Sequence, residues 1–154
     1  MDAHLRAYII QRLQNSPLPP VRLGFEITET AVVKNIDQVN QFIREIKQYG
    51  CKVYLDDFGS GYASYSYLKD LEVDCIKIDG VFVKDLLQEK SSHAMVKSIT
   101  EIAHYANKQV IAEYAETEAV IIELRNLEVD FAQGYGIGLP RPLNSLLKSV
   151  VAYG

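Results

Sequence analysis

The sequence predicts an α/β fold with about five parallel strands and helices between them. Five short apolar runs of strand length alternate with segments whose apolar residues recur at helical spacing. This alternation is typical of parallel strands joined by right-handed helical crossovers. Polar side chains also stand near the end of every apolar run. Because barrels and open α/β sheets build their sites at the carboxyl ends of strands, this placement indicates the same fold class.

Each predicted strand is an apolar run next to turn residues. In the second, Val53 and Leu55 suit a buried strand, and Asp56 and Asp57 follow where that strand should end. Gly59 and Gly61 then supply a turn that few other residues allow. The five predicted strands are 22–28, 52–57, 74–79, 109–115 and 130–135.

The intervening segments have one apolar face, as amphipathic helices do. The breakers Pro17, Pro19 and Pro20 end the first helix, and Gly50 closes the second. The predicted helical segments are 3–13, 35–49, 62–69 as a short helix or turn, 82–87, 91–106, 117–127 and one that begins near Leu143. Their candidate capping residues are Asn35 or Asp37, Ser91 or Ser92, and Thr117.

The bulk properties are those of one globular domain spanning residues 1–154. A net charge of −4 argues against a surface for a nucleic-acid polymer, but allows a small phosphate-bearing molecule held through metal. Cys51 and Cys75 lack metal-binding spacing, so we expect reduced core thiols in a cytoplasmic protein, with a disulfide as the alternative. No signal peptide or membrane span is evident, and we expect no membrane contact.

Four carboxylates from three predicted strands would converge on one rim, namely Glu26, Asp56, Asp57 and Glu113. This set suits one or two Mg²⁺ or Mn²⁺ ions, because both prefer hard oxygen ligands, and the lack of His or Cys partners argues against zinc. Two such ions are a recurring device for phosphodiester cleavage. For Asp56 and Asp57 taken alone, a polar loop with a helix N-cap explains the residues equally well.

Lys77 interrupts an otherwise apolar strand among these acids. It could orient a water molecule or neutralise developing charge, and the alternative is a structural ion pair. Glu29 is expected to support the Asp56-Asp57 segment rather than bind metal, and the alternative is a helix N-cap or a solvated loop acid. His4, His93 and His104 lie on predicted helices away from the rim, and we assign them no catalytic role.

Three further polar residues have two interpretations each. Glu116 could steady the site or cap the following helix. Gln133 could bind a ligand or a catalytic water, or be a satisfied core amide. Arg141 could contact a phosphate or base, or be a surface residue after a Gly/Pro loop.

Five segments, in order and spacing, resemble the successive motifs of EAL-domain cyclic-di-GMP phosphodiesterases. They are 25–29 (Phe-Glu-Ile-Thr-Glu), 55–62 (Leu-Asp-Asp-Phe-Gly-Ser-Gly-Tyr), 76–79 (Ile-Lys-Ile-Asp), 112–116 (Ala-Glu-Tyr-Ala-Glu) and 133–135 (Gln-Gly-Tyr). The motif-bearing region spans residues 22–142. The resemblance implies part of a TIM-like (β/α)8 barrel that hydrolyses cyclic di-GMP to linear pGpG with Mg²⁺ or Mn²⁺.

The resemblance also implies roles for individual residues. Lys77 would contact the attacking water and, with Glu113, belong to the catalytic set. Gln133 would support the substrate side. The implied metal ligands are Glu26, Asp56, Asp57 and Glu113, and the implied supports are Glu29 and Glu116.

The chain departs from the family pattern at several places. No Glu-Ala-Leu motif occurs, and no Asn-x-Ser motif precedes Glu26. About the first three strands of the barrel, with two metal ligands, are therefore expected to be missing. At Tyr114–Ala115 many relatives have Gly-Val. An incomplete barrel leaves open sheet edges, so we expect self-association or pairing with a missing N-terminal part.

Two functions follow from these observations. The first is a phosphodiesterase fragment that cleaves cyclic di-GMP, which the retained acids favour. The second is a catalytically inactive truncated module that binds nucleotide or a protein partner, which the missing strands favour.

Overall fold

The computed structural model describes residues 2–59 and 67–142 and confirms the α/β class. Within them a parallel five-stranded sheet has the order β1-β2-β3-β4-β5, so each strand pairs with the next along the chain. In a barrel, the order of strands along the sheet follows their order in the chain. In a doubly wound sheet, the strand order reverses at one point. The strands are β1 (Gly24–Thr28), β2 (Lys52–Phe58), β3 (Cys75–Ile78), β4 (Gln109–Ala112) and β5 (Phe131–Ala132).

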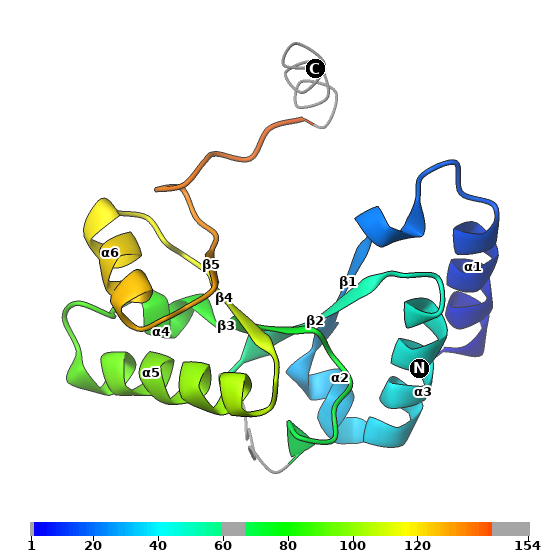
Figure 1. The fold of residues 1–154 in the computed structure, drawn as a ribbon, viewed down its shortest axis with the longest axis horizontal. Helices are drawn as coiled ribbons and strands as arrows, with labels where there is room; N and C mark the ends of the chain where they lie inside the picture. Colours follow the sequence, from blue (N-terminus) through cyan, green and yellow to red (C-terminus); the bar gives the residue numbers. More distant parts are fainter. Residues whose placement is uncertain (1, 60–66, 143–154) are drawn as a thin grey trace.

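The sheet curves into an open arc with helices on its convex side (Figure 1). The helices are α1 (Ala3–Gln14), α2 (Glu29–Lys34), α3 (Ile36–Lys47), α4 (Gly80–Lys84), α5 (Lys90–Tyr105) and α6 (Glu118–Asn126), with a 3₁₀ turn η1 (Pro20–Arg22) before β1. Helix α1 lies outside α3, where Arg6 forms an ion pair with Glu45 (Figure 1). The concave side of the arc carries no helix of the described chain.

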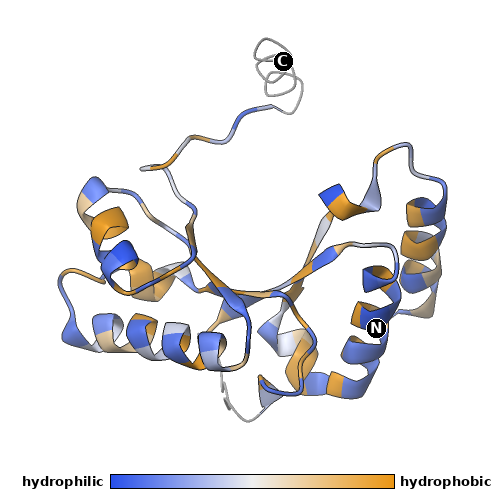
Figure 2. Cartoon of the chain, in the orientation of Figure 1, coloured by the Kyte–Doolittle hydropathy of each residue, from blue (hydrophilic) through white to orange (hydrophobic). Residues whose placement is uncertain are grey.

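The core fills the space between the convex face of the sheet and these helices. Alternate strand residues such as Val53, Leu55 and Val110 are fully buried there, together with Ile43 from α3 and Ile99 from α5. Each helix carries both hydrophobic and hydrophilic residues, as a helix covering one face of a sheet must (Figure 2). The residues between the buried ones on β2 point to the concave side, where Tyr54 is partly exposed.

Several helix ends follow the predicted capping. The Asn35 side chain accepts a hydrogen bond from Gln38 N at 3.0 Å and the Thr117 side chain accepts one from Val120 N at 3.3 Å. Gly50 follows α3 with φ +88° and Gly59 follows β2 with φ +99°, both in the left-handed region that glycine tolerates. Gly61 and most of the predicted segment 62–69, like the helix near Leu143, lie outside the described residues.

Other boundaries differ from the prediction. The first strand begins at Gly24 because Pro20–Arg22 form η1, and β4 and β5 end at Ala112 and Ala132. Helix α5 begins at Lys90, so Ser91 and Ser92 lie within its first turn and do not cap it. Helix α4 begins two residues early because Asp79 caps it through Val81 N at 2.9 Å. Helix α2 was not predicted.

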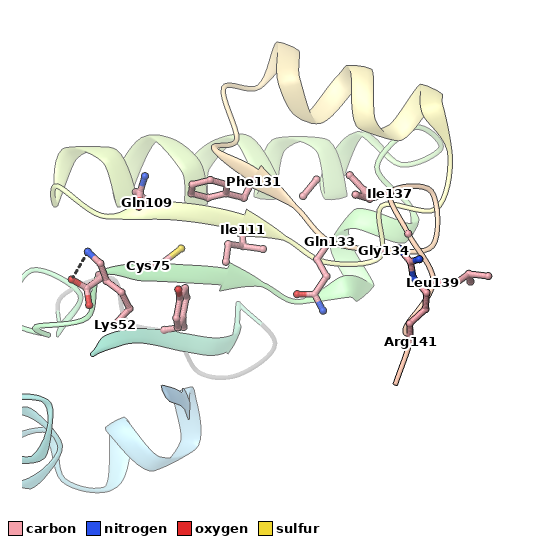
Figure 3. Close-up of a pocket in the computed structure, with 14 residues that line it drawn as sticks. Lys52, Cys75, Gln109, Ile111, Phe131, Gln133, Gly134, Ile137, Leu139 and Arg141 are labelled. Atoms are coloured by element: carbon pink, nitrogen blue, oxygen red, sulfur yellow. Dashed lines mark ion pairs between the residues drawn. The ribbon is translucent and has the colours of Figure 1, made fainter. Parts of the chain in front are cut away.

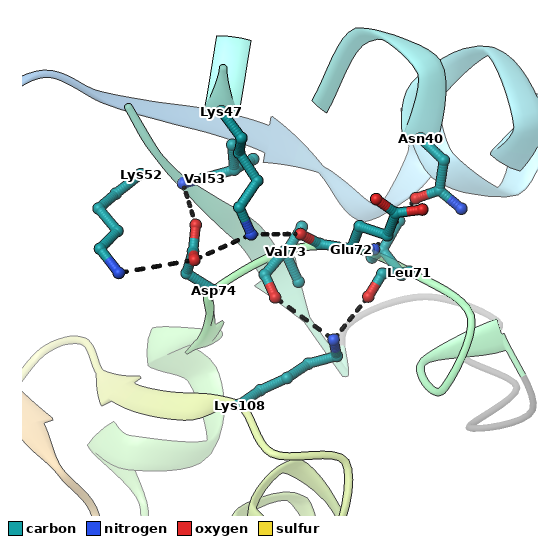
Figure 4. Close-up of polar contacts among 9 residues, drawn as sticks. All are labelled: Asn40, Lys47, Lys52, Val53, Leu71, Glu72, Val73, Asp74 and Lys108. Atoms are coloured by element: carbon teal, nitrogen blue, oxygen red, sulfur yellow. Dashed lines mark hydrogen bonds and ion pairs between the residues drawn. The ribbon is translucent and has the colours of Figure 1, made fainter. Parts of the chain in front are cut away.

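Charged side chains tie the amino ends of the strands together (Figure 4). Asp74 accepts a hydrogen bond from Val53 N at 2.8 Å and pairs with Lys47 at 2.9 Å and Lys52 at 3.6 Å. Buried Lys108 donates to Val73 O at 3.3 Å, and burial lowers its pKa. These contacts connect β2, β3 and β4, and so help to set the register that aligns their carboxyl ends.

Candidate functional site

Lys77 on β3 lies at the centre of a cluster of acids from three other chain segments. Its Nζ is 2.8 Å from Asp56 Oδ1, 2.8 Å from Glu113 Oε1 and 3.1 Å from Glu26 Oε1. The Lys77 side chain is only 5% exposed, whereas that of Glu26 is 53% exposed. The structure thus brings Glu26, Asp56 and Glu113 from β1, β2 and the end of β4 together around Lys77.

The acids keep Lys77 charged. Burial alone would lower the pKa of this ammonium, but hydrogen bonds to Asp56, Glu113 and Glu26 outweigh it and raise the pKa well above its ordinary value. Lys77 is therefore a fixed positive charge and a hydrogen-bond donor at neutral pH. It cannot serve as a general base there.

An irregularity within β2 places Asp56 and Asp57 together. Neighbouring residues of a regular strand point to opposite faces of the sheet, which would separate the two carboxylates. Here the register with β3 shifts between Leu55 and Phe58, and Asp57 has φ +57°. Aspartate tolerates this left-handed conformation better than most residues. The irregularity is thus the reason that both side chains can face the same ligand.

Asp56, Asp57 and Glu113 form a group that could hold a metal ion. One carboxylate oxygen of each lies within 4.8 Å of the others. Burial raises the pKa of Asp57, and the charges of Asp56 and Asp79 raise it further. Asp56 Oδ1 is buried, and its charge is partly balanced by Lys77 Nζ at 2.8 Å. A hard cation among these three carboxylates would relieve their mutual repulsion, so the residues fit such an ion. Glu26 stands outside this group.

Glu29 contacts the segment that follows the paired aspartates. It is 4% exposed at the start of α2, and its carboxylate accepts hydrogen bonds from Gly59 N at 3.3 Å and Tyr67 Oη at 3.0 Å. Burial, and then the charge of Glu29, raise the pKa of Tyr67. This geometry is what a loop support requires. The part played by Tyr67 could not be read from the sequence, because its hydroxyl meets a partner 38 residues away.

Gln133 and Arg141 line a hollow of about 560 Å³ on the concave face (Figure 3). Its apolar wall includes Ile111 and Phe131. A neighbouring hollow joins Gln133 to Glu26 and Lys77, so Gln133 opens toward the acid cluster. Gln133 is exposed, and the alternative of a satisfied core amide is wrong for the described chain.

Glu116 is exposed and shares a third hollow, of about 390 Å³, with Glu113. The cap of α6 is Thr117, so Glu116 does not fill that role. Among the described residues, Glu116 therefore lies beside the site but forms no ion pair with it.

The histidines and cysteines lie apart from the acids. His93 contacts Glu123 at 2.7 Å and His104 contacts Asp130 at 2.8 Å, both from α5, and His4 is on α1. Both cysteines are free and buried, as expected, and burial raises the pKa of Cys75 to about 11.

Within the described ranges, no helix has both the length and the apolar character needed to cross a bilayer.

The family model described as "EAL domain" matches residues 1–140. The cyclic di-GMP phosphodiesterase PdeB of Shewanella oneidensis is 41% identical over 138 residues, which are 90% of this chain and 16% of PdeB. The cyclic di-GMP phosphodiesterase PdeA of Borreliella burgdorferi is 36% identical over 91% of this chain and 21% of its own length. The chain therefore spans about a fifth, or less, of these two relatives.

Solved structures agree with the sequence matches. The PaMucR phosphodiesterase in its c-di-GMP complex superposes with a TM-score of 0.86 at 31% identity, over 94% of this chain and 58% of that one. The EAL domain of Mycobacterium smegmatis DcpA gives 0.86 at 30% identity, over 100% of this chain and 69% of that one. The barrel order, the acid cluster and these matches agree, and the chain belongs to the EAL domain family.

Proposed function

We propose that the chain is a phosphodiesterase domain that hydrolyses cyclic di-GMP to linear pGpG. The observation that carries this proposal is the group of Asp56, Asp57 and Glu113 oxygens next to the buried ammonium of Lys77. A phosphodiester is an anion, and its cleavage builds up further negative charge on oxygen. A site with both cation ligands and a fixed positive charge suits that chemistry.

Mg²⁺ or Mn²⁺ is the ion we propose for these carboxylates, with Glu26 as a further ligand and two ions in a complete family domain. Such an ion supplies a nucleophilic hydroxide at neutral pH and stabilises charge on the phosphate. Asp56, Asp57 and Glu113 would each contribute one carboxylate oxygen, and Asp57 is the most exposed of the three.

The remaining residues would position water and substrate. Lys77 stays protonated, so it would donate a hydrogen bond to the attacking water and hold its lone pair toward phosphorus. Glu29 would hold the backbone at Gly59 beside the metal ligands. Gln133 and Arg141, which line one hollow, would contact the nucleotide, and Glu116 would support that side from the neighbouring hollow.

A second candidate is a catalytically inactive module that binds nucleotide or a protein partner. Two features favour it. Lys77 pairs with three of the acids, and these ion pairs compete with a cation. In addition, the concave face leaves Phe131 51% exposed, where a closed barrel would cover it.

We further propose that additional polypeptide covers the concave face of this single domain, either a second copy of the chain or an N-terminal barrel part. The edges of β1 and β5 support this, because neither pairs with a further strand of the described residues and unpaired strand edges promote association. Light scattering that gives a monomer at micromolar concentration would count against self-association. The buried free cysteines fit a cytoplasmic location, which is also a proposal.

The decisive experiment is hydrolysis of cyclic di-GMP to pGpG with Mn²⁺ or Mg²⁺, with Glu113→Gln as the site variant and Asp70→Asn as the control. Asp70 is exposed on the chain before β3. We expect turnover in the parent chain and in the control, and a loss of at least 100-fold in Glu113→Gln, on the order of other catalytic-group removals. No turnover by a folded parent chain would favour the binding module instead.

A further inference from the structure

Tyr114, the residue after Glu113, has an unusual backbone conformation. Its φ of +57° lies in the left-handed region, which disfavours a bulky side chain. The residues on either side fix its direction. Glu113 N donates to Ile78 O at 3.5 Å and Ala115 N donates to Gln133 O at 3.0 Å. The Tyr114 side chain is therefore aimed by the ends of the neighbouring strands.

The ring of Tyr114 packs against the backbone at the start of α4. A Cβ atom added to Gly80 would lie 2.2 Å from Tyr114 Cδ2 and 2.9 Å from Cε2, so only glycine leaves room for the ring. One side of the ring thus has a rigid support. Tyr114 nevertheless stays 55% exposed, which leaves the rest of its surface available to a ligand.

That exposed surface lines the hollow of about 390 Å³ next to the acid cluster. Glu113, Gln133 and Tyr135 line it as well, and Tyr135 is 65% exposed. The loop that carries Tyr135 is held close to Tyr114, because a Cβ on Gly134 would lie 2.4 Å from Ala115 N. Two exposed aromatic rings therefore border one hollow, beside a carboxylate that belongs to the candidate metal group.

We propose that Tyr114 is a specificity-determining residue that stacks on a nucleobase of the bound nucleotide, an inference that rests on the function proposed above. A phosphate held through metal at Asp56, Asp57 and Glu113 would place the attached nucleoside within reach of the adjacent hollow. Planar bases stack on exposed aromatic rings, and such stacking changes affinity by about 5- to 150-fold per base. The strained backbone at Tyr114 holds the ring in the position that this contact needs.

The experiment compares two ligands that share a sugar and a phosphate. Guanosine 5′-monophosphate carries a base, and ribose 5-phosphate does not. Titration calorimetry with Mg²⁺ gives the ratio of their dissociation constants for the parent chain and for Tyr114→Ala, Tyr114→Gly and Tyr114→Phe. We expect the parent and Tyr114→Phe to prefer the monophosphate with the base by about 5-fold or more, and the other two variants to lose most of that preference.

The control is Tyr105→Ala, which removes a ring that is 92% exposed at the end of α5 and should leave the preference unchanged. Glycine suits the left-handed backbone at this position, so the thermal midpoint of Tyr114→Gly should match or exceed that of the parent chain. A lost preference in that variant could then not be due to misfolding. A preference that survives in Tyr114→Ala, a gain in affinity, or no preference in the parent chain would each overturn the stacking proposal. A folded chain that keeps the preference but cleaves no cyclic di-GMP would overturn the phosphodiesterase activity alone.

Discussion

The ammonium of Lys77 lies 2.8 Å from Glu113 Oε1, although 36 positions separate the two residues in the sequence. Lys77 is on β3, and Glu113 directly follows β4, its hydrogen-bonded neighbour. This pair joins the charge at the centre of the sheet to the candidate metal group. It also implies that the folded arrangement of the acid cluster is stabilised by Lys77.

Lys77→Met should destabilise the chain in the absence of divalent metal. It leaves Asp56, Glu113 and Glu26 without their shared cation, and breaking a buried pair on one side costs about 3 kcal/mol. Urea unfolding with EDTA measures the loss. Lys97→Met is the control, because Lys97 is exposed and pairs only weakly with Glu101 at 3.9 Å, and it should change stability by less than about 0.5 kcal/mol. Equal effects of the two substitutions would show that the cluster is not held by Lys77.

Mn²⁺ should raise the thermal midpoint of the parent chain through Asp56, Asp57 and Glu113. Binding to the folded state alone stabilises by about 1.4 kcal/mol at ten times the dissociation constant. Asp57→Asn and Glu113→Gln should reduce this gain, and Asp70→Asn should keep it. Differential scanning fluorimetry across a Mn²⁺ titration checks the prediction, and an identical gain in all four proteins would place the ion elsewhere.

Tyr67→Phe should weaken the link between Glu29 and the segment after β2. The substitution removes one of the two donors that the described residues supply to the buried Glu29 carboxylate, at a cost of about 1–2 kcal/mol. Urea unfolding of the parent chain, Tyr67→Phe, Glu29→Gln and the double variant gives the four unfolding free energies of a double-mutant cycle. We expect a coupling free energy of about 1 kcal/mol. Tyr105→Phe is the matched control on an exposed ring. Additive effects in the cycle would mean that the hydrogen bond contributes nothing measurable.

The ionised Asp74 side chain should stabilise the folded chain at neutral pH, and this stabilisation should be lost at acidic pH. Burial alone would raise its pKa, but the hydrogen bonds from Lys47 and Val53 N, with the charges of Lys47 and Lys52, outweigh it and lower the pKa. A carboxyl with a depressed folded pKa stabilises the fold above its unfolded pKa of about 3.9, and loses that contribution as the pH falls through the folded value.

Asp74→Asn should therefore cost about 1–3 kcal/mol at pH 7. Its deficit relative to the parent chain should shrink as the pH falls below about 4, because the parent then loses the same charge. Urea unfolding of both proteins from pH 7 to pH 3 measures this difference. A deficit that stays constant over the range would show that Asp74 acts only as a neutral hydrogen-bond acceptor.

The alternation of apolar runs and helical segments was enough to predict five parallel strands joined by helices. Val53 and Leu55 are buried at the two-residue spacing of a strand, and the local caps at Asn35 and Thr117 depend only on residues three positions away. The predicted ends of β4 and β5 were wrong, because Glu113 and Gln133 continue the sequence pattern but lie past the last paired residues of the two strands.

The sequence by itself determined which residues carry charge at the strand ends, because local periodicity and composition encode the strands that bear them. Only the tertiary structure decided how those charges meet. The left-handed backbone at Asp57, the three contacts of Lys77 and the packing of Tyr114 on Gly80 each need the relative placement of strands that are far apart in the chain. Sheet register and the irregularity in β2 set these distances, and neither is a local property of the sequence.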